Sequence, residues 1–150
     1  MHWNPGHELQ NGRLIIQGSL GHGGFGITYK ALHTGFNAPV VIKTPNAFLR
    51  NDPEYLKYVD RFIREAQILA RLENDPHPHI VRVKDFFKEK FGTETAHCLV
   101  MEFIEGKNLL ELVQERGRLS ETNALGLICP IAEALGQFHG LGAVHRDVTP

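Results

Sequence analysis

The sequence predicts an α+β protein, in which a strand-rich lobe with one helix is followed by a portion made of helices alone. Two observations support this order. Short runs of β-branched and aromatic residues, bounded by glycine and proline, recur before residue 104 and are interrupted by one stretch with helical periodicity. After residue 107, apolar residues recur at helical spacing.

Three strands are expected before the first helix. The first covers 14–20, and after a glycine-rich turn the alternating apolar residues of 25–29 predict its hairpin partner. The run 40–43 is short, rich in β-branched residues and bounded by prolines, which indicates a third strand.

The first helix is expected to begin with Asp52 as its N-cap and Pro53 at the first helical position, and to end near Leu72. Its apolar residues recur at three- and four-residue spacing, namely Val59, Phe62, Ala66 and Leu69. Two further strands, 80–87 and 96–103, are predicted to follow, joined by a polar turn.

The remaining residues are predicted to be helical. Asn108 and Glu111 have the spacing of a capping box, which indicates a short helix after them. Ser120 is expected to cap a longer helix that reaches about His139, and Pro130 inside it is expected to produce a kink.

The composition is that of an ordinary globular protein, with 42% hydrophobic and 22% charged residues. A net charge of -1 offers no basic field for binding nucleic acid, so nucleic acid is not expected as a partner. The sequence contains neither a secretory signal nor an apolar run long enough to span a membrane, and a cytoplasmic location is expected.

Cysteines and histidines are considered for metal binding and redox chemistry. Cys98 and Cys129 lie in apolar runs without metal-ligand spacing, and both are expected to be buried thiols. His77 and His79 would point the same way on an extended segment, but no third ligand is evident nearby. A loop that leads into a strand is therefore favoured over a metal site, and no metal ligand is expected within the chain.

The segment Gly21–Gly26 matches the pattern G-x-G-x-x-G. Backbone without Cβ atoms can approach phosphate oxygens closely and present N–H groups to them. A dinucleotide-binding fold would require a helix to open at the last glycine, but 27–29 continue as a strand. A glycine-rich hairpin without a ligand remains the competing interpretation of this motif alone.

Lys43 and Glu65 are candidates for one ion pair. Lys43 ends an apolar strand, where it points either to solvent or into a cleft. Glu65 lies on or beside the apolar stripe of the first helix, and a carboxylate facing a core needs a cationic partner. Arg61, one turn earlier, is the local alternative, but Lys43 is the more economical partner if the helix packs on the sheet.

Together these residues resemble the protein kinase family over essentially the whole chain from about Gly12. The resemblance rests on five blocks in family order: the glycine loop and third strand (20–43), the helix segment RFIREAQILARL (61–72), the strand entry (78–81), the hinge LVMEFIEG (99–106) and the catalytic-loop start HRDVTP (145–150). Pro150 resembles the proline that the serine/threonine branch of the family carries at this position of the catalytic loop. The segment GGFGITY resembles the glycine loops of bacterial members.

The resemblance implies a kinase-like fold with a five-stranded antiparallel N-lobe sheet and one helix, followed by the first helices of an α-helical C-lobe. It implies a division of the chain into an N-terminal tail (1–11), an ATP-binding N-lobe (12–102), a hinge (103–107) and a partial C-lobe (108–150). ATP and a protein substrate are the implied partners.

It also implies the site residues. Asp147 is the expected catalytic base, and Lys43 with Glu65 completes the catalytic set. Nucleotide binding is expected at Leu20, Gly21, His22, Gly23, Gly24, Phe25, Gly26, Thr28, Val41, Lys43, Met101, Glu102 and Ile104.

Three departures from the family pattern bear on activity. Val41 replaces the usual alanine, and Thr149 stands where serine/threonine kinases usually carry lysine. The sequence stops at Pro150, before the asparagine and aspartate that hold Mg²⁺ in the family, so this fragment is expected to be inactive. A short ATP-binding pseudokinase or scaffold is the alternative, whereas small-molecule kinases usually carry H-G-D at the position of His145-Arg146-Asp147.

Overall fold

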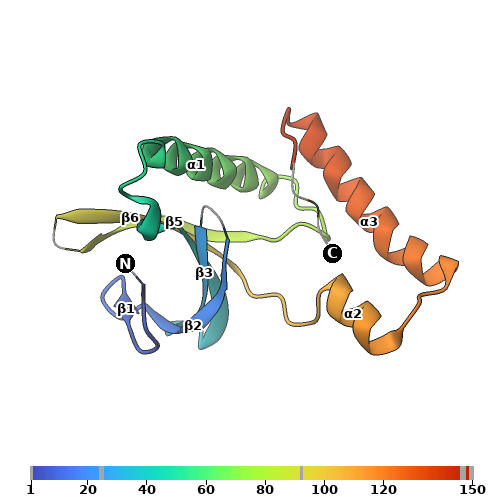
Figure 1. The fold of residues 1–150 in the computed structure, drawn as a ribbon, viewed down its shortest axis with the longest axis horizontal. Coiled ribbons are helices and arrows are strands. Elements are labelled where there is room, and N and C mark those ends of the chain that lie inside the picture. The colour runs from blue at the N-terminus through green and yellow to red at the C-terminus, as the bar shows by residue number, and fades with distance from the viewer. Residues whose placement is uncertain (1, 24–25, 92, 146–147, 149–150) are drawn as a thin grey trace. The chain divides into compact units, whose positions relative to one another are not determined.

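A computed structural model describes residues 2–23, 26–91, 93–145 and 148 of the 150-residue chain. The chain divides into two compact units (Figure 1). The first comprises Met1–Asn74 and Val81–Phe103, and the second comprises Asp75–Ile80 and Ile104–Pro150.

The first unit is built on an antiparallel sheet with the strand order β1-β2-β3-β4-β6-β5 (Figure 1). Its strands are β1 (Glu8–Leu9), β2 (Leu14–His22), β3 (Gly26–His33), β4 (Ala38–Pro45), β5 (Val83–Phe91) and β6 (Glu94–Glu102). All five predicted strands are present. The sheet nevertheless has six strands, because the two-residue strand β1 adds to the edge of β2.

The boundaries of the β5–β6 hairpin differ from the prediction. The polar stretch 88–95, expected to be a turn, instead extends both strands, with Lys88 paired to His97 and Lys90 to Thr95. Side chains of β5 alternate between exposed and half-buried positions. Polar residues fit such a strand because the ladder is made by backbone groups and only one face has to be apolar.

Helix α1 (Tyr55–Leu72) packs on the sheet and begins two residues later than expected. The carboxylate of Asp52 accepts a hydrogen bond from the N–H of Glu54 (2.8 Å), and so stabilises a turn before the helix. A short 3-10 helix, η1 (Ala47–Leu49), precedes that turn. The buried face of α1 consists of Phe62, Ala66, Leu69 and Leu72.

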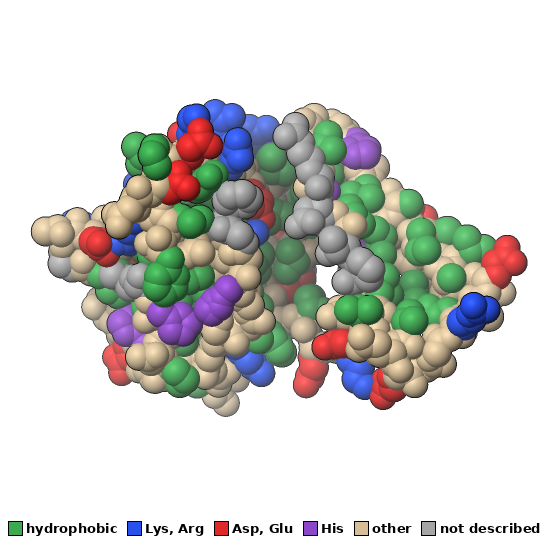
Figure 2. Space-filling view, in the orientation of Figure 1, with side chains coloured by type: hydrophobic (Ala, Val, Ile, Leu, Met, Phe, Trp, Pro, Cys, Tyr) green, Lys and Arg blue, Asp and Glu red, His purple; other side chains and the backbone are tan. Residues whose placement is uncertain are grey.

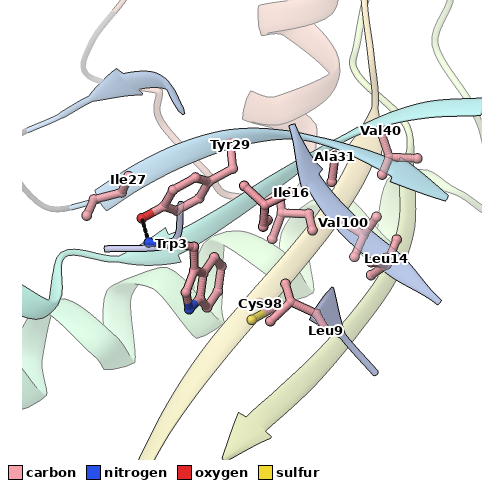
Figure 3. Packing of buried hydrophobic residues seen from close by; sticks show 11 residues of the cluster. Trp3, Leu9, Leu14, Ile16, Ile27, Tyr29, Ala31, Val40, Cys98 and Val100 are labelled. Atoms are coloured by element: carbon pink, nitrogen blue, oxygen red, sulfur yellow. Dashed lines mark hydrogen bonds between the residues drawn. The ribbon is translucent and has the colours of Figure 1, made fainter. Parts of the chain in front are cut away.

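The opposite face of the sheet carries the main apolar core (Figure 3). Its members come from all strands except β5 and from the first residues of the chain: Trp3, Leu9, Leu14, Ile16, Ile27, Tyr29, Ala31, Val40, Ile42, Cys98 and Val100. Trp3 is 4% exposed and Leu9 is fully buried. The segment expected to be an N-terminal tail is therefore part of the first unit, because its two large apolar side chains fill this core.

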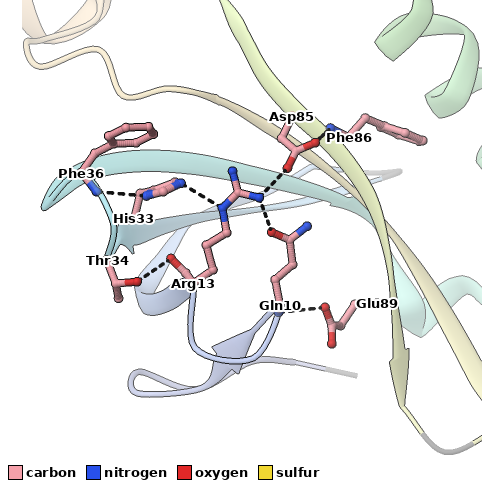
Figure 4. A network of polar contacts seen from close by, with 8 residues as sticks. All are labelled: Gln10, Arg13, His33, Thr34, Phe36, Asp85, Phe86 and Glu89. Carbon is pink, nitrogen blue, oxygen red and sulfur yellow. Dashed lines mark hydrogen bonds and ion pairs between the residues drawn. The ribbon is translucent and has the colours of Figure 1, made fainter.

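Contacts of this first segment also join the two edges of the sheet. The N–H of Gln10 donates to the Glu89 carboxylate (3.1 Å), and Arg13 lies 3.6 Å from the Asp85 carboxylate (Figure 4). The ring of Trp3 packs against Phe91 at a centroid distance of 5.7 Å. Glu89, Asp85 and Phe91 all belong to β5, the edge strand opposite to β1. The segment around β1 therefore contacts both edge strands of the sheet.

The second unit contains α2 (Leu109–Arg116) and α3 (Glu121–Gly140). The predicted capping box is present, since the Asn108 side chain accepts from the N–H of Glu111 (2.8 Å) and the Glu111 carboxylate accepts from the N–H of Asn108 (3.0 Å). The Ser120 hydroxyl caps α3, as predicted. Pro130 lies inside α3, and the helix continues on both sides of it.

Apolar side chains of the second unit lie partly in the open (Figure 2). Leu125 and Ile128 of α3 are more than half exposed. Cys129 is also exposed, so the expectation that both cysteines are buried was wrong for Cys129 and correct for Cys98. The residues around Cys129 are apolar but are not buried. Among the described residues of α3, Ala134 alone is buried. None of the helices in the part of the chain that the structure describes has the length and apolar character that a membrane span requires.

Candidate nucleotide-binding site

Several predicted site residues share the face of the sheet that carries α1. Val41 and Lys43 alternate with the buried core residues Val40 and Ile42 along β4, and therefore point to the other face. Thr28 lies directly across from Lys43 on β3, and Met101 lies across from Val41 on β6. Strand pairing thus gathers side chains from three neighbouring strands on one surface.

Lys43 and Glu65 form the predicted ion pair. The Lys43 Nζ donates to the Glu65 Oε1 at 2.6 Å, which joins β4 to the middle of α1. Among the described residues there is no ion pair between Arg61 and Glu65, so the local alternative is not the one adopted. The Lys43 side chain is 31% exposed and that of Glu65 is 48% exposed. The pair is therefore partly hydrated, and the expectation of a core-facing carboxylate overstated its burial.

The glycine segment forms the hairpin between β2 and β3. Gly21 and His22 end β2, Gly26 opens β3, and the N–H of Gly23 donates to the carbonyl of Gly26 (2.8 Å). A Cβ atom on Gly26 would lie 3.2 Å from the Thr44 carbonyl oxygen and 3.7 Å from Cε of Lys43. Gly26 thus lets the hairpin backbone approach the lysine side chain. Gly24 and Phe25 lie outside the described residues.

Glu102, predicted to contact the nucleotide at the hinge, is the last residue of β6 and belongs to the first unit. The backbone N–H of Glu102 donates to the Arg82 carbonyl (3.0 Å), and the Glu102 carboxylate accepts from the Arg82 N–H (2.9 Å). The Glu102 N–H is therefore already used within the protein. Ile104, which is 66% exposed, belongs to the second unit.

The other predicted residues are distributed as follows. Leu20 is an exposed residue of β2. Asp147 lies outside the described residues, as do Arg146, Thr149 and Pro150. His77 and His79 have ring centroids 5.6 Å apart, and the described residues contain no group of three metal-ligating side chains.

Burial favours the neutral form of two titratable groups on β6, as the shifts of their pKa values show. Burial lowers the pKa of His97, whose ring lies 6.2 Å from that of Phe86, and the positive charge of Lys88 lowers this pKa further. On the opposite face, burial raises the pKa of the Cys98 thiol to about 12. Cys98 is therefore a packed thiol and not a nucleophile.

A cavity of about 440 Å³ lies on the face opposite to Lys43. Its apolar floor includes Leu14, Val40 and Val100, and its walls include Arg13 and Phe36. Because Val40 and Val41 point to opposite faces of β4, this cavity is separate from the surface that carries Lys43.

The sequence analysis missed contacts made by the first residues of the chain. His2 lies against His22 of the glycine segment, with ring centroids 5.3 Å apart, and Trp3 lies against Tyr29 at 5.0 Å. One signal was available, since Trp3 is the single tryptophan of the sequence and stands in an otherwise polar segment. A large aromatic residue in such a segment indicates docking onto a core.

The fold and these pairings define an α+β lobe with a glycine hairpin, a strand lysine and a helix glutamate. Residues 14–150 match the protein kinase domain family. The chain therefore belongs to the protein kinase family.

Individual relatives show which branch of the protein kinase family the chain is similar to. The chain is 31% identical to the probable serine/threonine-protein kinase PknB of Bifidobacterium longum, with 95% of the chain and 20% of that protein covered. It is 34% identical to the serine/threonine-protein kinase pkn2 of Myxococcus xanthus, with 97% and 16% covered. These two relatives are thus serine/threonine kinases of bacterial origin, and the chain spans about a fifth of their length.

Solved structures agree with the fold. The apo form of PpkA-294 superposes with a TM-score of 0.77 at 26% identity, covering 99% of this chain and 55% of that one. The kinase domain of Mycobacterium tuberculosis PknI superposes with a TM-score of 0.73 at 26% identity, covering 99% and 55%. The kinase-like α+β fold expected from the sequence is therefore confirmed.

Proposed function

We propose that this chain carries the ATP-binding site of a protein serine/threonine kinase, on the face of the sheet that holds Lys43. The observation that carries the proposal is the 2.6 Å contact between Lys43 and Glu65, next to a hairpin whose Gly26 backbone approaches Lys43. The pair fixes an ammonium group close to backbone that has no side chain in the way. This combination suits the phosphates of a nucleotide.

The proposed roles follow from position. Lys43 and the N–H groups of the glycine segment hold the phosphates, and Glu65 orients Lys43. Val41 and Met101, adjacent across β4 and β6, provide an apolar surface for the adenine. The Glu102 N–H is occupied by Arg82, so any adenine contact by Glu102 uses its carbonyl. Leu20, Thr28 and Ile104 complete the proposed nucleotide contacts.

Asp147 is the proposed base that accepts the proton of a substrate hydroxyl. The proposed division is an N-lobe over 12–102, a hinge over 103–107 and a C-lobe portion over 108–150. Mg²⁺ is the proposed metal. In the family, its ligands come from residues later in the sequence than the position that corresponds to Pro150. The proposed substrate is a protein serine or threonine. Because ATP is the phosphoryl donor, the proposed compartment is the cytoplasm.

Isothermal titration calorimetry of the chain with Mg·ATP tests the binding site. Lys43→Met removes a charged donor to phosphate and is expected to weaken binding about ten- to a hundredfold. Lys84→Met is the matched control, because Lys84 is an exposed lysine of β5 that lines the cavity on the opposite face. Equal affinity of the wild-type and Lys43→Met chains would contradict the proposal.

A further inference from the structure

We propose that residues 2–13, the N-terminal strap, position the glycine segment, and that His2 and Trp3 thereby raise the affinity for the nucleotide. This inference rests on the proposed function and adds two positioning residues to it.

The strap contacts the glycine hairpin at the end of β2 and along β3. The His2 ring lies 5.3 Å from the ring of His22, which directly precedes Gly23, and Ser19 of β2 contacts the same His22 ring at 3.3 Å. The hydroxyl of Tyr29 accepts a hydrogen bond from the N–H of Trp3 (3.3 Å; Figure 3), and the same hydroxyl is hydrogen-bonded to Nδ1 of His2 (3.3 Å). Both strands of the hairpin are therefore held by the first two described residues.

The rest of the strap is anchored away from the hairpin tip. Backbone hydrogen bonds join Gly6 to the Ile16 carbonyl (2.8 Å) and Ile16 to the His7 carbonyl (2.9 Å). Gln10 is bound to Glu89 on the far edge strand (Figure 4). A segment fixed at one end to β5 and at the other to the hairpin restricts movement of the hairpin relative to the sheet.

The docking of Trp3 is tight in packing but incomplete in hydrogen bonding. Its ring contacts Tyr29, His7 and Phe91 at centroid distances of 5.0, 6.0 and 5.7 Å. Within the described part of the chain, Nε1 of Trp3 and Nε2 of His7 are buried without a hydrogen-bond partner. Buried polar atoms without a partner disfavour the docked state, so the strap is held less firmly than its buried area alone would give.

Coupling of this kind is reciprocal. If the docked strap favours the hairpin position that binds the nucleotide, the bound nucleotide favours the docked strap by the same factor. Trp3 is the single tryptophan of the chain and lies against the hairpin, so its fluorescence reports this coupling directly. Several histidine side chains gather on one face of the first unit (Figure 2), and the His7 ring stacks against the indole of Trp3 at a centroid distance of 6.0 Å.

The experiment compares Mg·ATP affinity by calorimetry and Trp3 fluorescence in the 150-residue chain and its variants. His2→Ala is expected to weaken binding about two- to tenfold, the range that a lost ring contact allows, and to reduce the fluorescence response to ATP. His2→Phe keeps a ring against His22 and is expected to restore most of the affinity. Glu8→Ala is the matched control, because Glu8 is an exposed strap residue and is expected to leave affinity within about twofold.

Each result decides the inference. Wild-type binding of ATP with unchanged affinity in His2→Ala, or an equal loss in Glu8→Ala, would overturn the positioning role while leaving the proposed function intact. A wild-type chain that does not bind Mg·ATP would overturn both. Circular dichroism of each variant checks that an affinity loss is not a loss of fold.

Discussion

Replacing Glu65 by glutamine separates the stabilising role of the ion pair from its proposed role in nucleotide binding. At 2.6 Å, two unit charges in water attract with about 1.6 kcal/mol before the ordering of both side chains is counted. Glu65 is 48% exposed and Lys43 is 31% exposed, so screening and side-chain entropy reduce the net contribution to less than about 1 kcal/mol. Glu65→Gln is therefore expected to lower the melting temperature by no more than about 4 °C.

The effect on nucleotide binding is expected to be larger. Without the carboxylate, the Lys43 ammonium is no longer held beside Gly26, and the affinity for Mg·ATP is expected to fall about tenfold or more. The assays are a thermal melt followed by circular dichroism and calorimetric titration with Mg·ATP. Glu115→Gln is the matched control, since Glu115 pairs with Lys107 at 2.7 Å on the second unit and is similarly exposed.

Two results would refute this reasoning. A loss of stability of about 3 kcal/mol or more would mean that the pair behaves as a buried one. An unchanged ATP affinity in Glu65→Gln, together with a normal melt, would mean that Glu65 does not orient Lys43 toward phosphate. A double-mutant cycle with Lys43→Met isolates the pairwise interaction.

Three further predictions concern the burial and packing of individual side chains. Iodoacetamide is expected to label Cys129 rapidly and Cys98 only after unfolding, because Cys98 is buried with its pKa raised to about 12; equal labelling rates measured by mass spectrometry would contradict this. The folded pKa of His97 is lowered, so the unfolded chain takes up the proton first and the free energy of unfolding is expected to fall as pH drops below about 6.5; His97→Gln should flatten this slope in urea titrations, and an unchanged slope would argue against it. Trp3→Ala is expected to cost about 3 kcal/mol in the same urea titrations, the low end for such a truncation because the indole Nε1 has no partner; a loss below about 1 kcal/mol would show that Trp3 is not part of the core.

Local sequence signals predicted most of the secondary structure. Alternation of apolar residues located the strands, and the capping box at Asn108 fixed the start of α2 because both of its hydrogen bonds form within four residues. The pairing of Lys43 with Glu65 was also accessible, since a strand end and a helix stripe constrain which charged groups can meet. The strand and helix-cap predictions depend on short-range patterns, and the ion pair depends on which face of each element its residues occupy; tertiary packing did not override either.

Features that depend on distant contacts were missed. Strand β1 has two residues in a polar segment, too few for any alternation, and its place in the sheet depends on Leu9 reaching a core formed by residues far along the chain. Asp52 has the sequence features of a helix cap, but its carboxylate stabilises the preceding turn instead. The exposure of Cys129 could not be predicted either, because an apolar run in the sequence does not show whether another part of the protein covers that run.

Amide NMR spectra of the chain, recorded during titration with Mg·ATP, test the location of the site most directly. We predict that the perturbed amides cluster at Gly21, Gly23 and Gly26 and around Lys43 and Met101. Perturbations centred instead on the opposite face, around the cavity floored by Leu14, Val40 and Val100, or spectra that do not change, would contradict the account.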